Sequence, residues 1–573
     1  MKNKIVLIFS LFLMIQLPGF SQFDFFNNQD SLWGHDPGNF NPILYYYTSV
    51  HAMMIKDGYL YLGGNMTNSG NITSYGCIKW DGNHFHSVGD TTIQDWNDNL
   101  SLAFQNSMLT YHNVIYGVGE HWDFFCLDTN TNHWINPLPP YDVGSVWTLA
   151  VYHDSLIIGG DGYNNPVTGS NVDAVAWYDN QFHDFGTNQF GCMGSVYELV
   201  VYNDELYAAG APYLARYAHD TIGQWEKVGG YADNYLHGLM LDTTNNFLWI
   251  VTNKIVDGTV HTDGASIWNG FYFEKGIYTH ADSTSINGSW GILDLAWYHG
   301  KLYATTSYGH PYPDDPTDTI PSSFWYIDSD MRWKPVGGIT IPLSFNDNTL
   351  TVYKDDLYWG ARYYPQGSAI EDTIIPGIRG TFGKWHAPQA TGCFWLMPRV
   401  LAHADTFYLP QGGGTVDVPL YNNNAYADSW QWDFDDGSTD TVKDPLHTYS
   451  QIGTYHVQVT VTEDGCTKTA EKDIVIMEAT GIADLSLKDL SFKIYPNPTK
   501  QDFTVEISLP ENIKGKNEFF VTGMGGANKY RRHIQSGFNR FVVSTTGWQP
   551  ATYICNLMAG NKFVGSKKLV LTK

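Results

Sequence analysis

The chain has 573 residues and a formal net charge of −26, with 58 acidic residues against 32 Lys and Arg. This length predicts several domains, and this acidity excludes the basic face that a nucleic-acid-binding protein needs. The charge is uneven. From Ser491 onward twelve Lys or Arg stand against four Asp or Glu, a net of +8, so the remainder carries −34. The shift predicts a domain boundary near Ser491.

Residues 1–21 have the features of a signal peptide. Lys2 and Lys4 precede an apolar run, Ile5–Ile15, that is too short to span a bilayer with ease, and small residues follow it. We expect cleavage before Gln22 and no lipid anchor, because no Cys follows the cut. Since no later stretch is long and apolar enough, we also expect no transmembrane segment.

A twelve-residue unit, represented by residues 146–157, recurs about seven times without a gap. Its seventh position is Tyr in five copies, and Lys56 and Thr244 are the exceptions. Its fourth position is always Leu or Met: Met53, Met108, Leu149, Leu199, Leu241, Leu295 and Leu350. Two apolar runs around a short polar gap are typical of a β-hairpin. A second hairpin signal, such as Trp80–Phe85, follows the unit.

Two hairpins in roughly 40–55 residues match the period of a propeller blade, and the units are similar to kelch-like β-propeller repeats. We therefore predict an all-β fold with a seven-bladed β-propeller over residues 22–396. Stacking blades in a ring buries the faces between neighbours. An array of β-sandwiches is the alternative. We expect the segment before Val50, which includes Ile43–Tyr47, to pair with the last blade and close the ring.

Residues 398–477 show the strict alternation of half-buried strands in a small β-sandwich. Three motifs, Trp432–Gly437, Asp444–Tyr449 and Gly453–Val457, resemble those of the PKD domain, although Asp435 stands where that family commonly has Gly. The resemblance implies an immunoglobulin-like sandwich that acts as an extracellular spacer or adhesion module. We interpret Asp433 and its neighbours as turn acids rather than as a calcium site.

A linker, residues 478–491, leads to a last predicted domain, residues 492–573. Tyr495–Pro498, the turn at 523–526, Ala551–Tyr553 and the closing basic and apolar strand resemble the type A C-terminal sorting domain of the type IX secretion system. The family commonly has Gly at the position of Ala551. The resemblance implies passage across the outer membrane by that secretion machinery, usually with removal of this domain, and a secreted or surface location. An ordinary terminal sandwich is the alternative.

The six cysteines are far apart and form no CxxC pair, so we expect no zinc site and no other metal or cofactor. Export permits disulfides. Cys393 with Cys466 is one candidate pair, and free buried thiols are the alternative.

No catalytic motif stands out in the sequence. The first three positions of each unit should surround the entrance of a propeller funnel, where polar and aromatic side chains suit a small polar ligand or a sugar. The candidate ligand-binding residues are His51, Asn106, Trp147, Tyr197, Glu198, Asp294 and Asn348. Simple variation at solvated strand ends is the alternative interpretation.

These observations favour a secreted or surface-displayed, non-catalytic binding or adhesion protein that contacts an extracellular glycan or surface protein. The second hypothesis is an extracellular polysaccharide-active enzyme, a lyase or hydrolase, with its site in the funnel. The third is a purely structural adhesin. Buried carboxylates with perturbed pKa values would favour the enzyme, and a funnel filled by apolar side chains would favour the adhesin.

Overall fold

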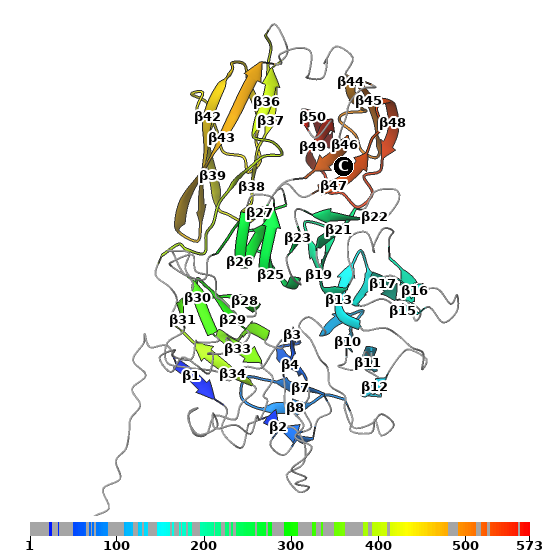
Figure 1. Ribbon diagram of the computed structural model, residues 1–573, viewed down its shortest axis with the longest axis vertical. Helices are drawn as coiled ribbons and strands as arrows, with labels where there is room; N and C mark the ends of the chain where they lie inside the picture. Colours follow the sequence, from blue (N-terminus) through cyan, green and yellow to red (C-terminus); the bar gives the residue numbers. More distant parts are fainter. Residues whose placement is uncertain are drawn as a thin grey trace, which may run out of the picture.

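The structure is a computed structural model, and it describes residues within 22–33, 50–89, 108–135, 146–185, 195–277, 292–306, 324–335, 349–360, 382–409, 413–478 and 491–572, with breaks inside several of these ranges. The regular structure of these residues is all β (Figure 1). Three bodies follow one another along the chain. We call them the seven-sheet module (β1 to β34), the middle module (β35 to β43) and the terminal module (β44 to β50).

Seven antiparallel sheets make up most of the described part of the first module; six have four strands and the fifth has five, and the seventh takes its fourth strand, β1, from the start of the chain. The first three sheets contain β3 (Ala52–Lys56), β4 (Tyr59–Gly63), β7 (Cys77–Trp80) and β8 (Phe85–Ser87); β9 (Met108–Tyr111), β10 (Val114–Val118), β11 (Phe124–Asp128) and β12 (His133–Ile135); and β13 (Val146–Tyr152), β14 (Ser155–Gly160), β17 (Val175–Tyr178) and β18 (Phe182–Asp184).

The fourth, fifth and sixth sheets contain β19 (Val196–Tyr202), β20 (Glu205–Gly210), β21 (Leu214–Ala218) and β22 (Gln224–Val228); β24 (Leu236–Asp242), β25 (Phe247–Asp257), β26 (Val260–Trp268) and β27 (Phe273–Ile277); and β28 (Ile292–Tyr298), β29 (Lys301–Thr306), β30 (Phe324–Ile327) and β31 (Lys334–Pro335). The seventh contains β32 (Thr349–Tyr353), β33 (Asp356–Gly360), β34 (Phe382–His386) and β1 (Gln22–Phe25). Strand β23 (Tyr231–Ala232) also pairs with β25. A small three-stranded sheet contains β2 (Leu32–Trp33), β5 (Asn68–Ser69) and β6 (Ile72–Thr73), and a two-stranded one contains β15 (Tyr163–Asn164) and β16 (Asn171–Val172).

The polar gap of the repeat is a two-residue turn. In the third sheet Tyr152 pairs with Ser155, and His153 and Asp154 between them have φ angles of 45° and 59°. Positive φ at both central residues is the type I′ geometry, whose twist matches that of the flanking strands. Asn and Asp tolerate this region better than most residues, which explains why they fill this gap.

The gap-free alignment of the fifth copy is wrong by two residues. Asp242 pairs with Phe247 there, so four residues form the turn instead of two. Leu239 pairs with Ile250, as Leu149 pairs with Ile158 in the third sheet, and both leucines are buried. Leu241 is 37% exposed. Leu239 therefore takes the fourth position, and Asp242, not Thr244, takes the seventh.

Apolar side chains fill the space between consecutive sheets. Seven clusters of buried residues each combine side chains of one sheet with those of the next, and one of them joins the first sheet to the seventh. In that cluster Leu60 and Leu62 of β4 pack with Tyr358 of β33 and Phe382 of β34. The first strands of successive sheets also contact one another, and β3 contacts both β9 and β32.

The tyrosines of the seventh position bond each sheet to the following one. Their hydroxyl groups donate to main-chain carbonyl oxygens in the next turn: Tyr111 to Asp154, Tyr152 to Asp204, Tyr202 to Asn246, Tyr298 to Asp355 and Tyr353 to Gly58. The two exceptions also reach the next sheet. Lys56 donates to Asn113 Oδ1 at 3.1 Å, and the Asp242 carboxylate accepts from Trp297 Nε1 at 2.7 Å.

The early part of the chain meets the strands of the seventh sheet at two further places. Strand β1 pairs antiparallel with β34, from Gln22 opposite His386 to Phe25 opposite Gly383. The expected pairing of the early segment with the last sheet is therefore made by β1, and Ile43–Tyr47 lie outside the described residues. A side chain at Gly360 would have no room, because its Cβ would lie 2.8 Å from the carbonyl oxygen of Val50.

The middle module packs two layers around Trp432 and Phe434. Its sheets contain β36 (Thr406–Leu409), β43 (Cys466–Glu478), β42 (Gly453–Glu463), β39 (Ser429–Asp433) and β40 (Thr439–Asp440); β37 (Val416–Pro419) and β41 (Leu446–Tyr449); and β35 (Val400–Leu401) and β38 (Tyr421–Asn422). Asp433 Oδ1 accepts a hydrogen bond from Asp435 N, and Asp436 Oδ1 accepts one from Ser438 N. These acids cap turn amides, as predicted.

The terminal module is a second two-layer sandwich around Phe519 and Val543. Its sheets contain β44 (Ser491–Tyr495), β45 (Phe503–Leu509) and β48 (Gly537–Val543); and β47 (Asn528–His533), β46 (Glu518–Thr522), β49 (Ala551–Ala559) and β50 (Lys562–Leu571). Figure 1 shows this module beside the middle module, with both above the fourth and fifth sheets.

A disulfide and an amide cluster join the seven-sheet module to the middle module. Cys393 pairs with Cys466, while Cys77, Cys126 and Cys555 are buried thiols. Cys192 lies outside the described residues. The Asn245 side chain, in the long turn of the fifth sheet, accepts from Met397 N at 2.8 Å, and Asn423 Nδ2 donates to the Asn245 carbonyl at 2.8 Å.

Candidate functional site

The second and third positions of the repeat lie at a β-bulge. In β13, β19 and β28 the register with the following strand shifts across the second position, which is occupied by Trp147, Tyr197 and Leu293. A bulge bends its strand and redirects the side chains beside it. The side chains at the second and third positions therefore point in other directions than those of the rest of the strand, and they contribute to the site described below.

The aromatic residues of two neighbouring bulges stack on each other. The ring centroids of Trp147 and Tyr197 lie 4.5 Å apart, and their planes differ by 16°. Both side chains are partly exposed. The fourth-position leucines that follow them, Leu149 and Leu199, are 4% exposed. The stack is therefore held by adjacent sheets at the end of their first strands.

A cavity of about 500 Å³ lies where the first strands of the sheets converge. All seven sheets contribute to its wall, mostly with the fourth to sixth positions of the unit. Its apolar lining includes Met53, Met108, Leu149, Leu199, Leu239, Leu295 and Leu350. Two acidic residues, Glu198 and Asp294, belong to the same wall. The cavity is thus lined by apolar side chains together with polar groups, which include two carboxyl groups.

Glu198 is buried and bonded to the next sheet. Its Oε2 accepts a hydrogen bond from the main-chain N–H of Leu239, in the fifth sheet, at 2.6 Å. Burial raises the pKa of Glu198 well above its ordinary value, and the charge of Asp294 raises it further. A carboxyl group in such surroundings holds its proton more tightly than one in water.

Asp294, in the sixth sheet, makes the same kind of contact with the seventh sheet. Its carboxylate accepts from Leu295 N and, in the seventh sheet, from Leu350 N, both at 2.7 Å. Burial raises the pKa of Asp294 to about 7.

The third position of the third sheet is Thr148, which has no charge. Its Oγ1 accepts a hydrogen bond from Leu199 N, in the fourth sheet, at 3.2 Å. Thr148, Glu198 and Asp294 therefore share one contact, an oxygen that receives an amide of the following strand. Thr148 makes this contact with a hydroxyl group, and Glu198 and Asp294 make it with a carboxylate. The common role of the third position is therefore to join neighbouring sheets.

The structure brings together four of the seven candidate residues. Trp147 and Tyr197 form the stack, and Glu198 and Asp294 line the cavity. His51, at the second position of the first copy, is buried with 1% of its surface exposed. Asn106 and Asn348 lie outside the described residues.

Asp242 is a buried acid that the sequence analysis missed. Its carboxylate accepts from Trp297 Nε1 at 2.7 Å and from Asn245 N at 3.0 Å, and burial raises its pKa. The shifted alignment of the fifth copy hid it, because that alignment placed Thr244 at the seventh position. With the four-residue turn recognised, Asp242 falls at the position that bonds to the next sheet.

Metal ligands do not gather among the described residues, where no group of three or more His, Cys, Asp or Glu side chains is placed to hold an ion. The part of the chain that the structure describes also contains no helix long and apolar enough to cross a membrane.

Comparison with known families identifies two parts of the chain. Residues 418–477 match the PKD domain, and residues 493–572 match the secretion system C-terminal sorting domain. Both resemblances found in the sequence are thereby confirmed. The protein is exported. The type IX sorting domain directs it to the secretion machinery and to release or attachment at the cell surface.

Individual proteins show only partial or weak similarity to the chain. A stretch of 118 residues is 31% identical to a microbial collagenase of Vibrio alginolyticus, and it spans 19% of this chain and 14% of the collagenase. The extracellular domain of a hybrid two component system of B. thetaiotaomicron is 11% identical, with a TM-score of 0.37, over 90% of this chain and 64% of that one. A β-glucuronidase of Bacteroides uniformis is 9% identical, with a TM-score of 0.14, over 31% of this chain and 25% of that one.

Proposed function

We propose that the seven-sheet module is a seven-bladed β-propeller that serves as a non-catalytic recognition module on an exported protein. The apolar clusters between consecutive sheets, the pairing of β1 with β34 and the bond from Tyr353 to Gly58 support the ring arrangement. A closed ring leaves few exposed strand edges and presents its loops to the surroundings. The middle module then serves as a spacer between the ring and the envelope.

The stack of Trp147 on Tyr197 carries the proposal of recognition. Two partly exposed aromatic rings, fixed by neighbouring sheets, offer a rigid apolar surface with polar edges at little entropic cost. Such a surface suits the apolar face of a sugar ring, while polar groups nearby bind its hydroxyl groups. We therefore propose an extracellular glycan as the ligand.

The contacts of the acids weigh against catalysis. A general acid or base must reach the atom to which it passes a proton, and the Glu198 and Asp294 carboxylates are occupied by amides of the following strands. Thr148 makes the same contact without an ionisable group.

The test is a binding survey of the full-length protein against immobilised glycans, with Trp147→Ala and Tyr197→Ala as variants. We expect both substitutions to weaken binding at least tenfold, since each removes half of the stack. Tyr426→Ala is the matched control, because Tyr426 is 78% exposed on the middle module, away from the stack. Unchanged glycan binding by both variants would reject the proposed ligand site.

A polysaccharide-active enzyme is the second candidate, because two acids with raised pKa values share one cavity. Raised pKa values suit a group that donates a proton at neutral pH. Turnover assays on the same glycans separate the two functions. Product formation by the wild type that Glu198→Gln or Asp294→Asn abolishes would favour the enzyme, and binding without product favours the recognition module.

A further inference from the structure

Strand β47 of the terminal module presents a row of basic side chains. Lys529, Arg531 and His533 alternate along the strand, and alternate residues of a strand lie on one face. The fourth sheet supplies the facing groups, which are acidic: Asp204, Glu205 and Glu226. The two surfaces are far apart in the sequence and have opposite charge.

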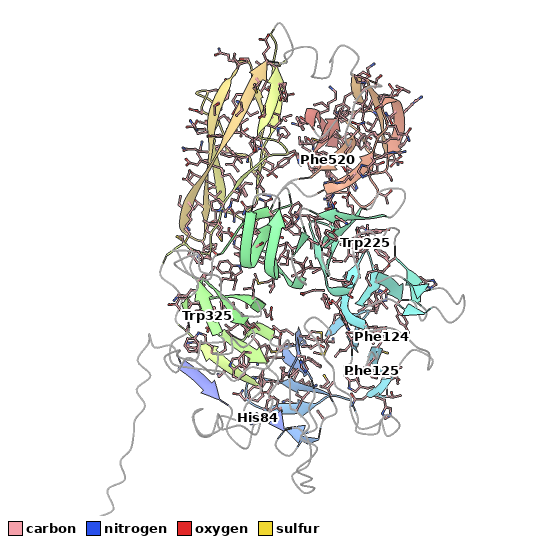
Figure 2. The ribbon with its side chains drawn as sticks, in the orientation of Figure 1. His84, Phe124, Phe125, Trp225, Trp325 and Phe520 are labelled. Carbon is pink, nitrogen blue, oxygen red and sulfur yellow. A yellow bond between two sulfur atoms is a disulfide. The ribbon has the colours of Figure 1, made fainter. Side chains whose placement is uncertain are left out.

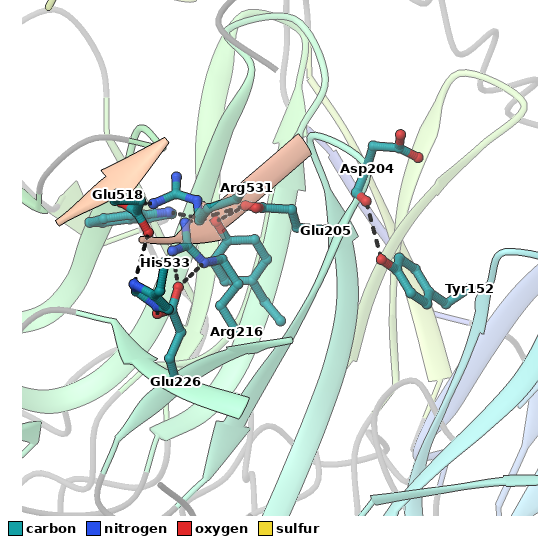
Figure 3. Close-up of polar contacts among 10 residues, drawn as sticks. Tyr152, Asp204, Glu205, Arg216, Glu226, Glu518, Arg531 and His533 are labelled. Atoms are coloured by element: carbon teal, nitrogen blue, oxygen red, sulfur yellow. Dashed lines mark hydrogen bonds and ion pairs between the residues drawn. The ribbon is translucent and has the colours of Figure 1, made fainter. Parts of the chain in front are cut away.

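Ion pairs cross this boundary at both ends of the row. Lys529 Nζ lies 3.1 Å from Asp204 Oδ2. His533 Nε2, which is charged only when the ring is protonated, lies 3.9 Å from Glu226 Oε2 (Figure 3). Between them Arg531 binds Glu518 Oε2 of its own module at 3.0 Å, and its charge also acts on Tyr207 of β20. The contacts that cross the boundary are thus made by the two ends of the strand.

A largely buried guanidinium group organises the acids of the fourth sheet. Arg216 binds Glu226 and lies 3.4 Å from Glu205, and its side chain is only 8% exposed. Glu205 and Glu518 are each 9% exposed in their side chains. Buried charges are costly unless they are paired, so this cluster suits a face that is normally covered.

A second face of the terminal module packs against the middle module. The rings of Phe563 and Phe407 lie 5.1 Å apart, and Phe563 belongs to the apolar core of the middle module. Phe520, labelled in Figure 2, contacts His403 at 4.5 Å between ring centroids. The Tyr421 and Thr522 hydroxyl groups bond at 3.0 Å.

We propose that the terminal module is a docked subunit: the acidic face around Arg216 is its binding site, and it stays bound when the chain is cut between residues 478 and 491. The net charge of +8 on the residues from Ser491 onward, against −34 on the remainder, gives the docking its long-range attraction. The apolar contacts with the middle module hold it at short range.

The experiment uses the full chain with a specific protease site inserted between residues 478 and 491. After cutting, both fragments should elute together from a sizing column at low salt. Lys529→Glu should weaken their association about tenfold, because it places two acids together, and Asp204→Lys in the same chain should restore it. Sodium chloride should weaken the wild-type complex more than the Lys529→Glu complex.

Lys568→Glu is the matched control, since Lys568 is exposed on β50 and the substitution changes the charge equally. It should leave the association unchanged, and thermal melting of the uncut variants checks that each one folds. Fragments that separate at low salt would overturn the proposal. So would an association that Lys529→Glu and Lys568→Glu affect alike. Neither result depends on whether the seven-sheet module binds a glycan.

Discussion

The hydroxyl group of Tyr353, in the seventh sheet, donates a hydrogen bond to the carbonyl oxygen of Gly58, in the first sheet, at 2.6 Å. Four other tyrosines at the same repeat position make the equivalent bond to the sheet that follows them in sequence. Tyr353 differs because its partner stands near the opposite end of the module.

Tyr353→Phe removes this bond and keeps the ring. Tyr353 is 4% exposed, so we expect a loss of about 1 kcal/mol in unfolding free energy, the usual net value of one hydrogen bond. Calorimetry of the full chain measures it as a lower melting temperature of the seven-sheet module. Tyr426→Phe, at an exposed position, is the control. Equal melting temperatures for the two variants would contradict a stabilising role for this contact.

Removing residues 22–25 deletes β1 and leaves β34 as an unpaired edge. We expect a sharp fall in melting temperature and a greater tendency to aggregate, because exposed strand edges recruit other strands. Longer removal, through Tyr47, should have at least this effect. Asp24→Ala, which keeps the main-chain pairing, is the control. A truncated chain that melts with the wild type would show that β1 does not stabilise the seventh sheet.

Asp294 predicts a pH dependence of stability. Its pKa is about 7 in the folded protein and about 3.9 in an unfolded chain, so the folded state binds more protons between these values. Stability from this group is therefore fully present below about pH 4 and is lost as the pH rises to about 7. Asp294→Asn should remove this loss.

The check for Asp294 is the difference in melting temperature between variant and wild type, measured from pH 4 to pH 8. The difference should shift in favour of the variant up to about pH 7 and then stay level. A flat difference for Asp294→Asn would mean that this carboxyl group titrates normally.

The disulfide from Cys393 to Cys466 closes a loop of 73 residues. The chain-entropy relation gives about 4 kcal/mol for a loop of this size. Replacing both cysteines by Ser should therefore lower the melting temperature of the middle module and make it insensitive to a reducing agent. The wild type should move to the variant's value under reduction. A wild type that reduction leaves unchanged would contradict this.

The repeat and the two recognised domains could be predicted because their signals are local. The Tyr of the seventh position and the polar pair after it specify a tight turn in adjacent residues, and Trp432 and Phe434 alternate within one strand. The alignment of the fifth copy was wrong for a physical reason. A four-residue turn replaces the two-residue turn there, and a gap-free comparison reads this as Leu241 and Thr244 in place of Leu239 and Asp242.

The site was less accessible to sequence reasoning. The second position of the repeat suggested Trp147 and Tyr197 as candidates, but the spacing of residues gave no sign that Glu198 and Asp294 accept amides of the following sheets. The cluster around Arg216 depends on three segments more than 200 residues apart at their extremes. Its one local signal is the run of basic residues in β47, where Lys529, Arg531 and His533 share one face and Arg532 lies on the other.

The pairing of Gln22 with His386 has a consequence for biosynthesis. The strand that completes the seventh sheet is made early, and its partner emerges only after every other sheet of the module. Contacts of such long range slow folding, so the module stays incomplete while most of its chain is already synthesised. Pulse-labelling by hydrogen exchange during refolding of the full chain should therefore find the first six sheets protected before the seventh.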